Sequence, residues 1–509
     1  MVAKQFKCFE MFVIALLVTL PASSRSRVIV KSNEAFVTPN TTYVISSEID
    51  LKNTRISIPS NCTIIFGKKG RILNGSLEGT DTRLKRVRKN SIGVEISGSW
   101  LLTEIKDSFF DQTLLSDNQI LDNISQLLSE NIDNRVFIDK KEYRVKLSSQ
   151  HKYALMLKSK TRINIKSRIV LETNNLPHYA IVYISKADNI YLNGGVFVGD
   201  VGSHTYREGN SSQWGFGIAI ITSSNVTINN VHVSKCIGDG IYIGGGEGEL
   251  GDYTEASKAV FLNNVISEDN RRQGISITYA DGVSINNCIF KDTGKTEFIS
   301  PGCGLDIEPN EGQSVRNVNV RNCQFLNNDK VLNVSIGGYQ VKGALCNVEK
   351  IRFENCQVSG YLSIRTGSVQ LEKCSLVALS IHLATMPKEK VLIKNTKIRG
   401  GAGVRIRTVG ELAKGEYAPQ YEFVNCEISS GPKSEYALFG TLNHKGNEQM
   451  ATLTFKDCQL ELSKGNERYR LIQAGCVCDF VFDSCVFLPH GRTIDLSSVR
   501  TNDCTIIAE

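Results

Sequence analysis

The chain has 509 residues and a formal net charge of +7, from 59 basic and 52 acidic side chains. This mild excess gives no reason to expect a nucleic acid as partner. The length allows several globular domains, but abundant Gly (42) and sparse Pro (10) suit many short strands joined by turns.

The first 24 residues have the pattern of a secretory signal peptide. Lys4 and Lys7 supply positive charge, residues 11–20 form an apolar run too short to span a bilayer, and residues 21–24 supply small side chains for cleavage. No later segment is long and apolar enough for a membrane span. We therefore expect a periplasmic or secreted mature protein.

Residues 25–110 contain short β-like segments and are predicted to form a β-rich N-terminal module. Its basic run, Arg83 to Lys89, is either a solvated loop or a contact for an acidic polymer. The pattern predicts a helix at about 116–130, opened by a capping box of Ser116 and Gln119. Its apolar stripe fits a cap over the open end of a repeat stack.

A short phrase recurs from residue 226 onward: alternating apolar residues, then Asn, then Cys or a small residue. Clear copies end at Val231, Cys288, Cys323 and Cys356, and weaker ones at Cys374, Thr396, Cys426, Cys458 and Cys485. The gaps, about 18 to 35 residues, are typical of solenoid repeats. Each copy is a strand too short to bury its own apolar face, so stacking is required. We predict one parallel β-solenoid over residues 111–509.

The 15 Cys would usually indicate disulfides in an exported protein. Seven of them hold one repeat position, where a thiol is a small apolar filler. We expect a buried and mostly reduced ladder, in which a few neighbours are close enough to pair. Zinc-ligand spacing is missing from the sequence.

This arrangement resembles the pectate-lyase-like superfamily of right-handed parallel β-helices, especially its epimerase, lyase and tailspike-like branch. The segment 117–121 followed by 135–138 is similar to the opening of those domains, where a short helix leads into the first strand. The resemblance implies an all-β fold with an N-terminal capping helix. It does not imply one reaction, because the superfamily includes hydrolases, lyases, epimerases and non-catalytic proteins.

Aligning consecutive coils predicts an outward column that carries chemistry. Inward positions are Ile218, Ile241, Ile275, Leu305 and Leu332, and the positions after them are Ala219, Tyr242, Ser276, Asp306 and Asn333. A second outward column reads Ile221, Gly244, Thr278, Glu308 and Ser335. Asp306 and Glu308 would lie about 6.5–7 Å apart at Cα, and carboxyl groups about 6.5–9.5 Å apart suit an inverting glycosidase. Mutual repulsion would raise one pKa, as a general acid requires.

Asp239 precedes the Gly of its coil and is the third candidate catalytic carboxylate. The Gly-Asp-Gly phrase at 238–240 is similar to the acidic turn of polygalacturonase-type hydrolases, whose paired Asp and Gly-His-Gly are missing here. Arg271 and Arg272, with Gln273, are candidates to bind an acidic group of the substrate. In lyase and epimerase relatives a basic residue instead removes a proton next to a uronic carboxylate.

The long loop at 199–214 adds further candidates for substrate binding. It contains Asp200, His204, Glu208 and Trp214, and an aromatic face such as Trp214 stacks on sugar rings. Tyr242, from the outward column, joins this set. A long loop inside a tight solenoid is usually functional.

Three functions remain open. The first is an exported glycoside hydrolase that uses Asp306, Glu308 and Asp239 on a polysaccharide expected to be acidic. The second is a polysaccharide lyase or uronate epimerase using the Arg pair, with calcium as the one cofactor considered. The third is a non-catalytic glycan-binding solenoid. For the hydrolase we expect no cofactor and no metal; tailspike-like relatives imply that an oligomer can form.

Overall fold

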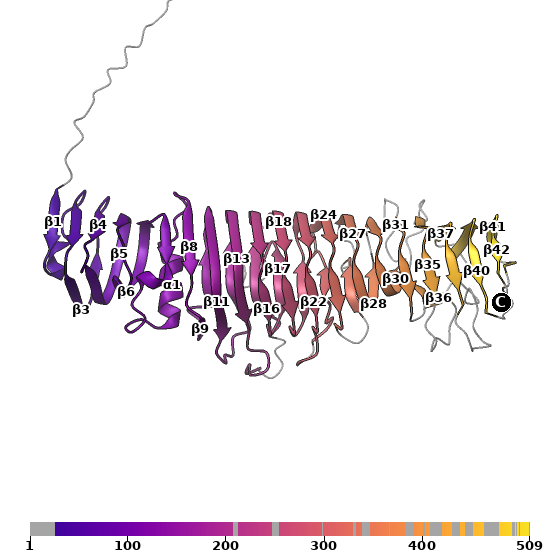
Figure 1. Ribbon diagram of the computed structural model, residues 1–509, viewed down its shortest axis with the longest axis horizontal. Coiled ribbons are helices and arrows are strands. Elements are labelled where there is room, and N and C mark those ends of the chain that lie inside the picture. Colours follow the sequence, from indigo (N-terminus) through magenta and orange to yellow (C-terminus); the bar gives the residue numbers. More distant parts are fainter. Residues whose placement is uncertain are drawn as a thin grey trace, which may run out of the picture.

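The computed structural model describes residues 26–206, 212–246, 254–297, 299–328, 332–337, 347–365, 367–382, 391–400, 403–407, 420–429, 438–442, 451–462, 478–490, 494, 496–497 and 499–507. Its strands stack into one elongated column, with the C-terminal coils at the far end from β1 (Figure 1). All strand pairs are parallel. A continuous core of buried apolar side chains runs from Val30 to Phe487. The predicted all-β, parallel β-helical fold is confirmed.

The N-terminal residues already form coils of the same kind. Strands β1, β2, β4, β5 and β3 pair in this order, and β6 pairs with β5. Their bounds are β1 Arg27–Val30, β2 Thr42–Ile45, β3 Glu48–Ser57, β4 Thr63–Phe66, β5 Arg71–Lys85 and β6 Ile92–Leu101, with short 3-10 turns η1 Asn33–Ala35 and η2 Asp107–Phe109.

In the main stack, a coil whose three strands are all described adds one strand to each of three faces. Face 1 contains β7 Glu104–Lys106, β8 Asn134–Ile138, the first halves of β11 Thr161–Leu171 and β13 Asp188–Val198, β15 Ser224–Asn229, β18 Ser257–Asn263, β21 Ala280–Asn286, β24 Ser314–Arg321, β27 Asn347–Glu354, β29 Val369–Glu372, β31 Val391–Lys394, β34 Gln420–Val424, β37 Ala451–Lys456, β39 Cys478–Asp483 and β41 Arg500–Asn502.

Face 2 contains β9 Glu142–Val145, the second halves of β11 and β13, β16 His232–Ser234, β19 Ile266–Glu268, β22 Ile289–Lys291, β25 Gln324–Leu326, the first halves of β28 Gln357–Ile364 and β30 Ser375–His382, β32 Lys397–Arg399, β35 Glu427–Ser429, β38 Gln459–Glu461, β40 Val486–Leu488 and β42 Thr505–Ile506. Face 3 contains β10 Tyr153–Leu157, β12 His178–Ser185, β14 Trp214–Ile221, β17 Asp239–Gly244, β20 Gln273–Ile277, β23 Leu305–Ile307, β26 Leu332–Ile336, the second halves of β28 and β30, β33 Val404–Arg407 and β36 Phe439–Leu442.

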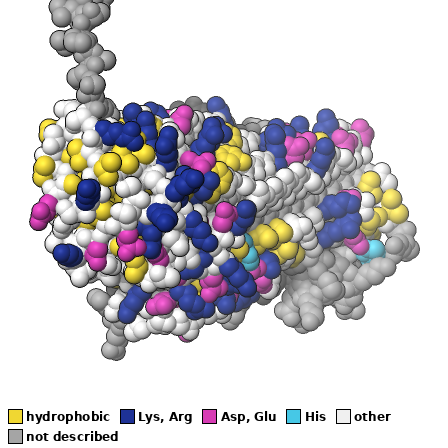
Figure 2. All heavy atoms as spheres, turned by 60° about the vertical axis from the view of Figure 1, so that its left-hand side comes forward, with side chains coloured by type: hydrophobic (Ala, Val, Ile, Leu, Met, Phe, Trp, Pro, Cys, Tyr) yellow, Lys and Arg dark blue, Asp and Glu magenta, His cyan; other side chains and the backbone are white. Residues whose placement is uncertain are grey.

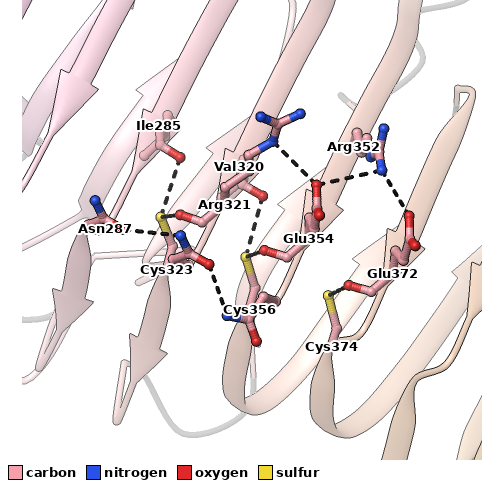
Figure 3. A network of polar contacts seen from close by, with 12 residues as sticks. Ile285, Asn287, Val320, Arg321, Cys323, Arg352, Glu354, Cys356, Glu372 and Cys374 are labelled. Carbon is pink, nitrogen blue, oxygen red and sulfur yellow. Dashed lines mark hydrogen bonds and ion pairs between the residues drawn. The ribbon is translucent and has the colours of Figure 1, made fainter.

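The recurring Asn-Cys phrase forms the turn from face 1 to face 2. At this turn Asn322 and Asn355 have φ of 53° and 54°, the left-handed region that Asn tolerates. Asn355 Nδ2 donates to Oδ1 of Asn322 at 2.9 Å, so the turns are joined by an amide ladder. The next residue, Cys356, points into the core, and its thiol donates to the carbonyl oxygens of Val320 and Glu354 at 3.5 and 3.4 Å (Figure 3). The phrase therefore encodes both a turn and a core position.

Ten cysteines with described side chains are free thiols: Cys62, Cys236, Cys288, Cys323, Cys356, Cys374, Cys426, Cys458, Cys485 and Cys504. All of these except Cys504 are buried. Cys323, Cys356 and Cys374 follow one another in a column (Figure 3). Thr396 takes the same position, where its hydroxyl donates to the carbonyl of Lys394 at 2.8 Å. A reduced thiol ladder, as expected, fills this position. Cys8, Cys346 and Cys476 lie outside the described residues, and the side chain of Cys478 is not described.

Replacing Asn355 with Ala is expected to lower the free energy of unfolding by about 1–2 kcal/mol, because an Ala Cβ is strained at positive φ. Gly should cost less, since it adopts this conformation freely. Urea unfolding measures both variants. Asn319→Ala, on strand β24, is the matched control and should change stability by less than about 0.5 kcal/mol; equal losses at the two positions would contradict the turn argument.

The helix α1 Asp117–Leu127 begins with the predicted capping box of Ser116 and Gln119. Its position differs from the expectation, because coils continue on both sides of it (Figure 1). Asn123 on the helix accepts from the backbone N–H of Ile96 and donates to the carbonyl of Val94 in β6. On the other side Ser125 accepts from the N–H of Met156 in β10. The helix thus takes the place of a strand inside the stack instead of covering an open end.

Candidate active site

Three consecutive strands of face 3 bring the predicted site residues together. Backbone pairing places Ala219, Tyr242, Ser276 and Asp306 side by side across β14, β17, β20 and β23. The inward residues Ile218, Ile241, Ile275 and Leu305 are fully buried. The outward column predicted from the sequence is therefore confirmed over these four coils.

The prediction for the next coil is wrong by two residues. Leu305 pairs with Val334 and Asp306 with Ser335, so Leu332 and Asn333 do not continue the two columns, and Ser335 does not follow Glu308. The register shifts between Leu332 and Val334, where β26 pairs with β28. The two-residue error has another source: the phrase at 331–334 begins with Val331 and lacks the Gly on which the other phrases are aligned.

Asp239 forms a buried ion pair with Arg272. The guanidinium Nε and Nη2 donate to the two carboxylate oxygens at 2.8 and 2.9 Å, and the Asp239 side chain is fully buried. Burial raises the pKa of Asp239 above its usual range, with a smaller contribution from Asp306, although Arg272 opposes the shift. Burial also opposes the charge of Arg272, but Asp239, Asp306 and Glu308 outweigh it and raise the pKa of Arg272. Arg272 is therefore held as a cation on Asp239.

Asp306 connects this pair to Glu308. Gln273 Nε2 donates to one oxygen of Asp306 at 2.6 Å. The carboxyl groups of Asp306 and Glu308 are hydrogen-bonded to each other. This direct contact corrects the expectation that a water fits between them, since inverting and retaining pairs are separated by about 6.5–9.5 and 5–5.5 Å.

Glu308 is the carboxyl group whose shifted pKa best suits a general acid. Burial, then the charge and the hydrogen bond of Asp306, raise the pKa of Glu308 to about 8, while Arg272 and Arg365 oppose the shift. This pKa lies above neutral pH, which favours the protonated form of Glu308 in the folded protein. A carboxylic acid kept neutral in this way can donate a proton to a leaving group.

These groups lie in a pocket of about 330 Å³, whose lining includes Tyr242, Arg272, Asp306, Glu308 and Arg365. Trp214 forms part of the wall, and its ring stacks on His178 with centroids 4.7 Å apart. Tyr242 and Thr278 are hydrogen-bonded through their hydroxyls at 2.9 Å. The pocket thus combines an aromatic wall, hydroxyls, carboxyl groups and two guanidinium groups, a set that suits a sugar chain.

Arg365 is a lining residue that the sequence analysis missed. Gly337 N donates to the carbonyl of Ile307, and Arg365 N to that of Ile336, so Glu308, Gly337 and Arg365 follow one another in a column. Gly337 has no side chain between the other two. Aligning Leu362 to Arg365 with Leu305 to Glu308 would have found the residue.

Asp239 is fully buried and does not itself line the pocket. Four further predicted residues either do not line the pocket or lie outside what is described. Arg271 turns toward the carbonyls of Glu297 and Ser212, at 2.6 and 3.3 Å, and lies over the ring of Tyr206. Asp200 and His204 are buried together, with Nδ1 of His204 at 2.9 Å from Asp200. Asp200 also accepts from Tyr179 and Asn174. Glu208 lies outside the described residues.

No group of three or more His, Cys, Asp or Glu side chains that could hold a metal ion occurs among the described residues. Asp306 and Glu308, the ligands considered for calcium, are instead hydrogen-bonded to each other. Calcium binding by Asp306 and Glu308 stays a prediction of the lyase alternative.

A parallel β-helix with a polar pocket on one face defines the class of protein. The family model described as a right handed beta helix region matches residues 143–342 and 216–411, more than half of the chain. The chain belongs to this family, which confirms the right-handed β-helix recognised from the sequence. None of the described helices is long and apolar enough to cross a membrane.

Relatives are similar over limited stretches. The uncharacterized protein YclG of Bacillus subtilis (strain 168) is 32% identical over 171 residues, which cover 32% of this chain and 29% of YclG. The chain thus aligns with less than a third of the length of this relative. Similar solved structures include the A-module of the mannuronan C-5 epimerase AlgE6 of Azotobacter vinelandii (12% identity, 78% and 96% coverage of this chain and that one, TM-score 0.44). Another is the tailspike protein of Escherichia coli bacteriophage HK620, with 12% identity, coverage of 76% of this chain and 75% of that chain, and a TM-score of 0.44. At 12% identity, these similarities show the type of fold and nothing about activity.

Proposed function

We propose that this protein is an exported glycoside hydrolase that cleaves a polysaccharide by general acid catalysis from Glu308. The observation that carries the proposal is the grouping of Asp306 and Glu308 with two Arg side chains in the lining of one pocket, where burial raises the pKa of Glu308 to about 8. Long outer faces suit long ligands. The predicted signal peptide supports export.

In the proposed step Glu308 donates its proton to the glycosidic oxygen as the bond from that oxygen to the anomeric carbon breaks. A water attacks the anomeric carbon and passes its proton to solvent water, while Asp306, in contact with Glu308, keeps Glu308 protonated before the transfer. Gln273 donates a hydrogen bond to Asp306 and so orients its carboxyl group. Arg272 holds Asp239 and adds positive charge beside the pair. Asp239 is a positioning residue here, because its carboxylate is fully used by Arg272.

The substrate class proposed is an acidic polysaccharide. Arg365 lines the pocket and its charge acts on Glu308, so a carboxylate on the sugar ring can pair with its guanidinium. Trp214 supplies a partly exposed ring in the same wall for apolar contact with a sugar.

The lyase and epimerase alternative is less well supported by the geometry of the Arg pair. A base must lose its proton, whereas Arg272 has a raised pKa and is bound by Asp239. Arg271 is directed toward backbone carbonyls away from the pocket. The non-catalytic alternative remains, and it predicts glycan binding without any change in the glycan.

The pH dependence of cleavage tests the role of Glu308. The active form of Glu308 is the protonated one, and the pKa of Glu308 is about 8. On the alkaline side of the pH profile, kcat/KM should therefore stay constant up to about pH 8 and fall about tenfold per pH unit above it. Reducing ends released from an acidic polysaccharide measure the rate. Glu311 is an exposed neighbour of Glu308 in the sequence, and Glu311→Gln should show the same fall of kcat/KM above about pH 8. A rate that stays constant up to about pH 10 would contradict the assignment.

A further inference from the structure

The basic run of the N-terminal coils is not used by the pocket. Lys68 and Lys69 form the turn after β4, and Arg86, Arg88 and Lys89 form the turn after β5; we call these five residues the basic corner. All five side chains are exposed, and none forms an ion pair with a described residue. Figure 2 shows Lys and Arg side chains gathered over the N-terminal part of the stack.

The two turns lie directly against each other. Thr63 to Ile65 pair with Arg83 to Lys85 as the strands enter the turns. As they leave, Ile72 N donates to Ser91 O, and Arg71 Nε donates to the carbonyl of Asn90. Neighbouring strands are about 4.8 Å apart, which is less than the Debye length of about 8 Å at physiological salt. The five cations therefore act on one ligand together.

Nearby carboxylates do not neutralise the basic corner. Glu48 and Asp111 are both bound by Arg71. One exposed cation contributes little binding free energy when it pairs with a single anion. A polyanion, however, contacts several of these cations at once. The spacing between coils is also close to the length of one sugar unit in an extended chain.

The basic corner is also remote from the pocket. The turn 86–91 stacks on the next turn, since Asn90 N donates to Ser108 O, and that turn follows β7 on face 1. The basic corner thus lies at the edge between faces 1 and 2, whereas the pocket lies on face 3. A ligand bound there does not occupy the pocket.

We infer that the basic corner is a second, non-catalytic binding site for a linear polyanionic glycan, with carboxylate or sulfate groups along the chain. A single-stranded nucleic acid is disfavoured because no exposed large hydrophobic side chain among the described residues belongs to these turns to stack on bases. The inference does not depend on the proposed hydrolysis.

Binding of the full chain to dextran sulfate and to polygalacturonate, with neutral dextran as reference, tests this site by calorimetry at low salt. The variant with Lys68, Lys69, Arg88 and Lys89 all changed to Gln should bind dextran sulfate at least about tenfold more weakly than the wild type. The matched control changes Arg135, Lys258, Lys350 and Lys456 to Gln, which removes the same charge from scattered exposed positions. It should weaken binding by no more than about twofold.

Several results would overturn the inference. These are equal losses in the two quadruple variants, absence of binding to either polyanionic glycan, or binding only to DNA or to phosphatidylglycerol vesicles. The measurement needs no cleavage, and Glu308→Gln should bind dextran sulfate like the wild type. Failure of the proposed hydrolysis therefore leaves the result for the basic corner unaffected.

Discussion

Glu308→Gln is expected to lower kcat by about 10²–10⁴-fold, because the amide cannot release a proton to the glycosidic oxygen. The fold should survive the change. Glu308 is protonated in the folded protein at neutral pH, and Gln has nearly the same shape and can also donate a hydrogen bond to Asp306. Rates of reducing-end release from an acidic polysaccharide measure the loss, with Glu311→Gln as the exposed control.

The stability of the same variant gives a second readout. A carboxyl group whose pKa is raised in the folded state contributes stability below its unfolded pKa and loses that contribution as pH rises through the folded pKa. For Glu308 this window extends from about 4.5 to about 8. Glu308→Gln has no such loss, so its melting temperature relative to wild type should rise across this window and then level off. A difference independent of pH, or full activity in the variant, would sink the assignment.

Arg272→Met is expected to lower the free energy of unfolding by about 3–5 kcal/mol, because it leaves Asp239 buried without its partner. Asp239 is fully buried and both of its oxygens accept from this guanidinium. Urea unfolding followed by circular dichroism measures the loss.

Two further variants control this prediction. Arg500→Met breaks an exposed ion pair with Asp479 and should cost less than about 1 kcal/mol. The double variant Asp239→Leu/Arg272→Met removes both charges and should regain most of the stability. If it is as unstable as Arg272→Met alone, then packing of the Arg side chain, and not the unpaired charge, explains the loss.

The fold could be predicted from the sequence because one phrase encodes a repeated local conformation. Asn at the left-handed turn position and Cys at the following core position return in successive coils. The place of helix α1 could not be predicted in the same way. Its apolar stripe shows that one side is buried, but both an end cap and an inserted layer bury that side, and only the contacts of Asn123 and Ser125 distinguish them.

For the pocket, the pattern of coils was sufficient to bring Asp239, Arg272, Gln273, Asp306 and Glu308 together. It failed for the phrase at 331–334, which lacks a leading Gly, and Arg365 was missed because the coil that contains it was not aligned. Alternation along a strand fixes which face a side chain lies on, but not its rotamer, so the contact between the two carboxyl groups was not foreseen. Polar residues of a loop can also serve the loop itself, as the buried contact of Asp200 with His204 shows.

The most direct test of the central claim is the product of cleavage. Purified protein is incubated with a panel of acidic and neutral polysaccharides, and reducing ends and the ultraviolet absorbance of unsaturated products are followed together, with and without calcium. Hydrolysis through Glu308 predicts reducing ends without absorbance, independent of calcium and lost in Glu308→Gln. Absorbance that rises with the reducing ends would show β-elimination and contradict the account.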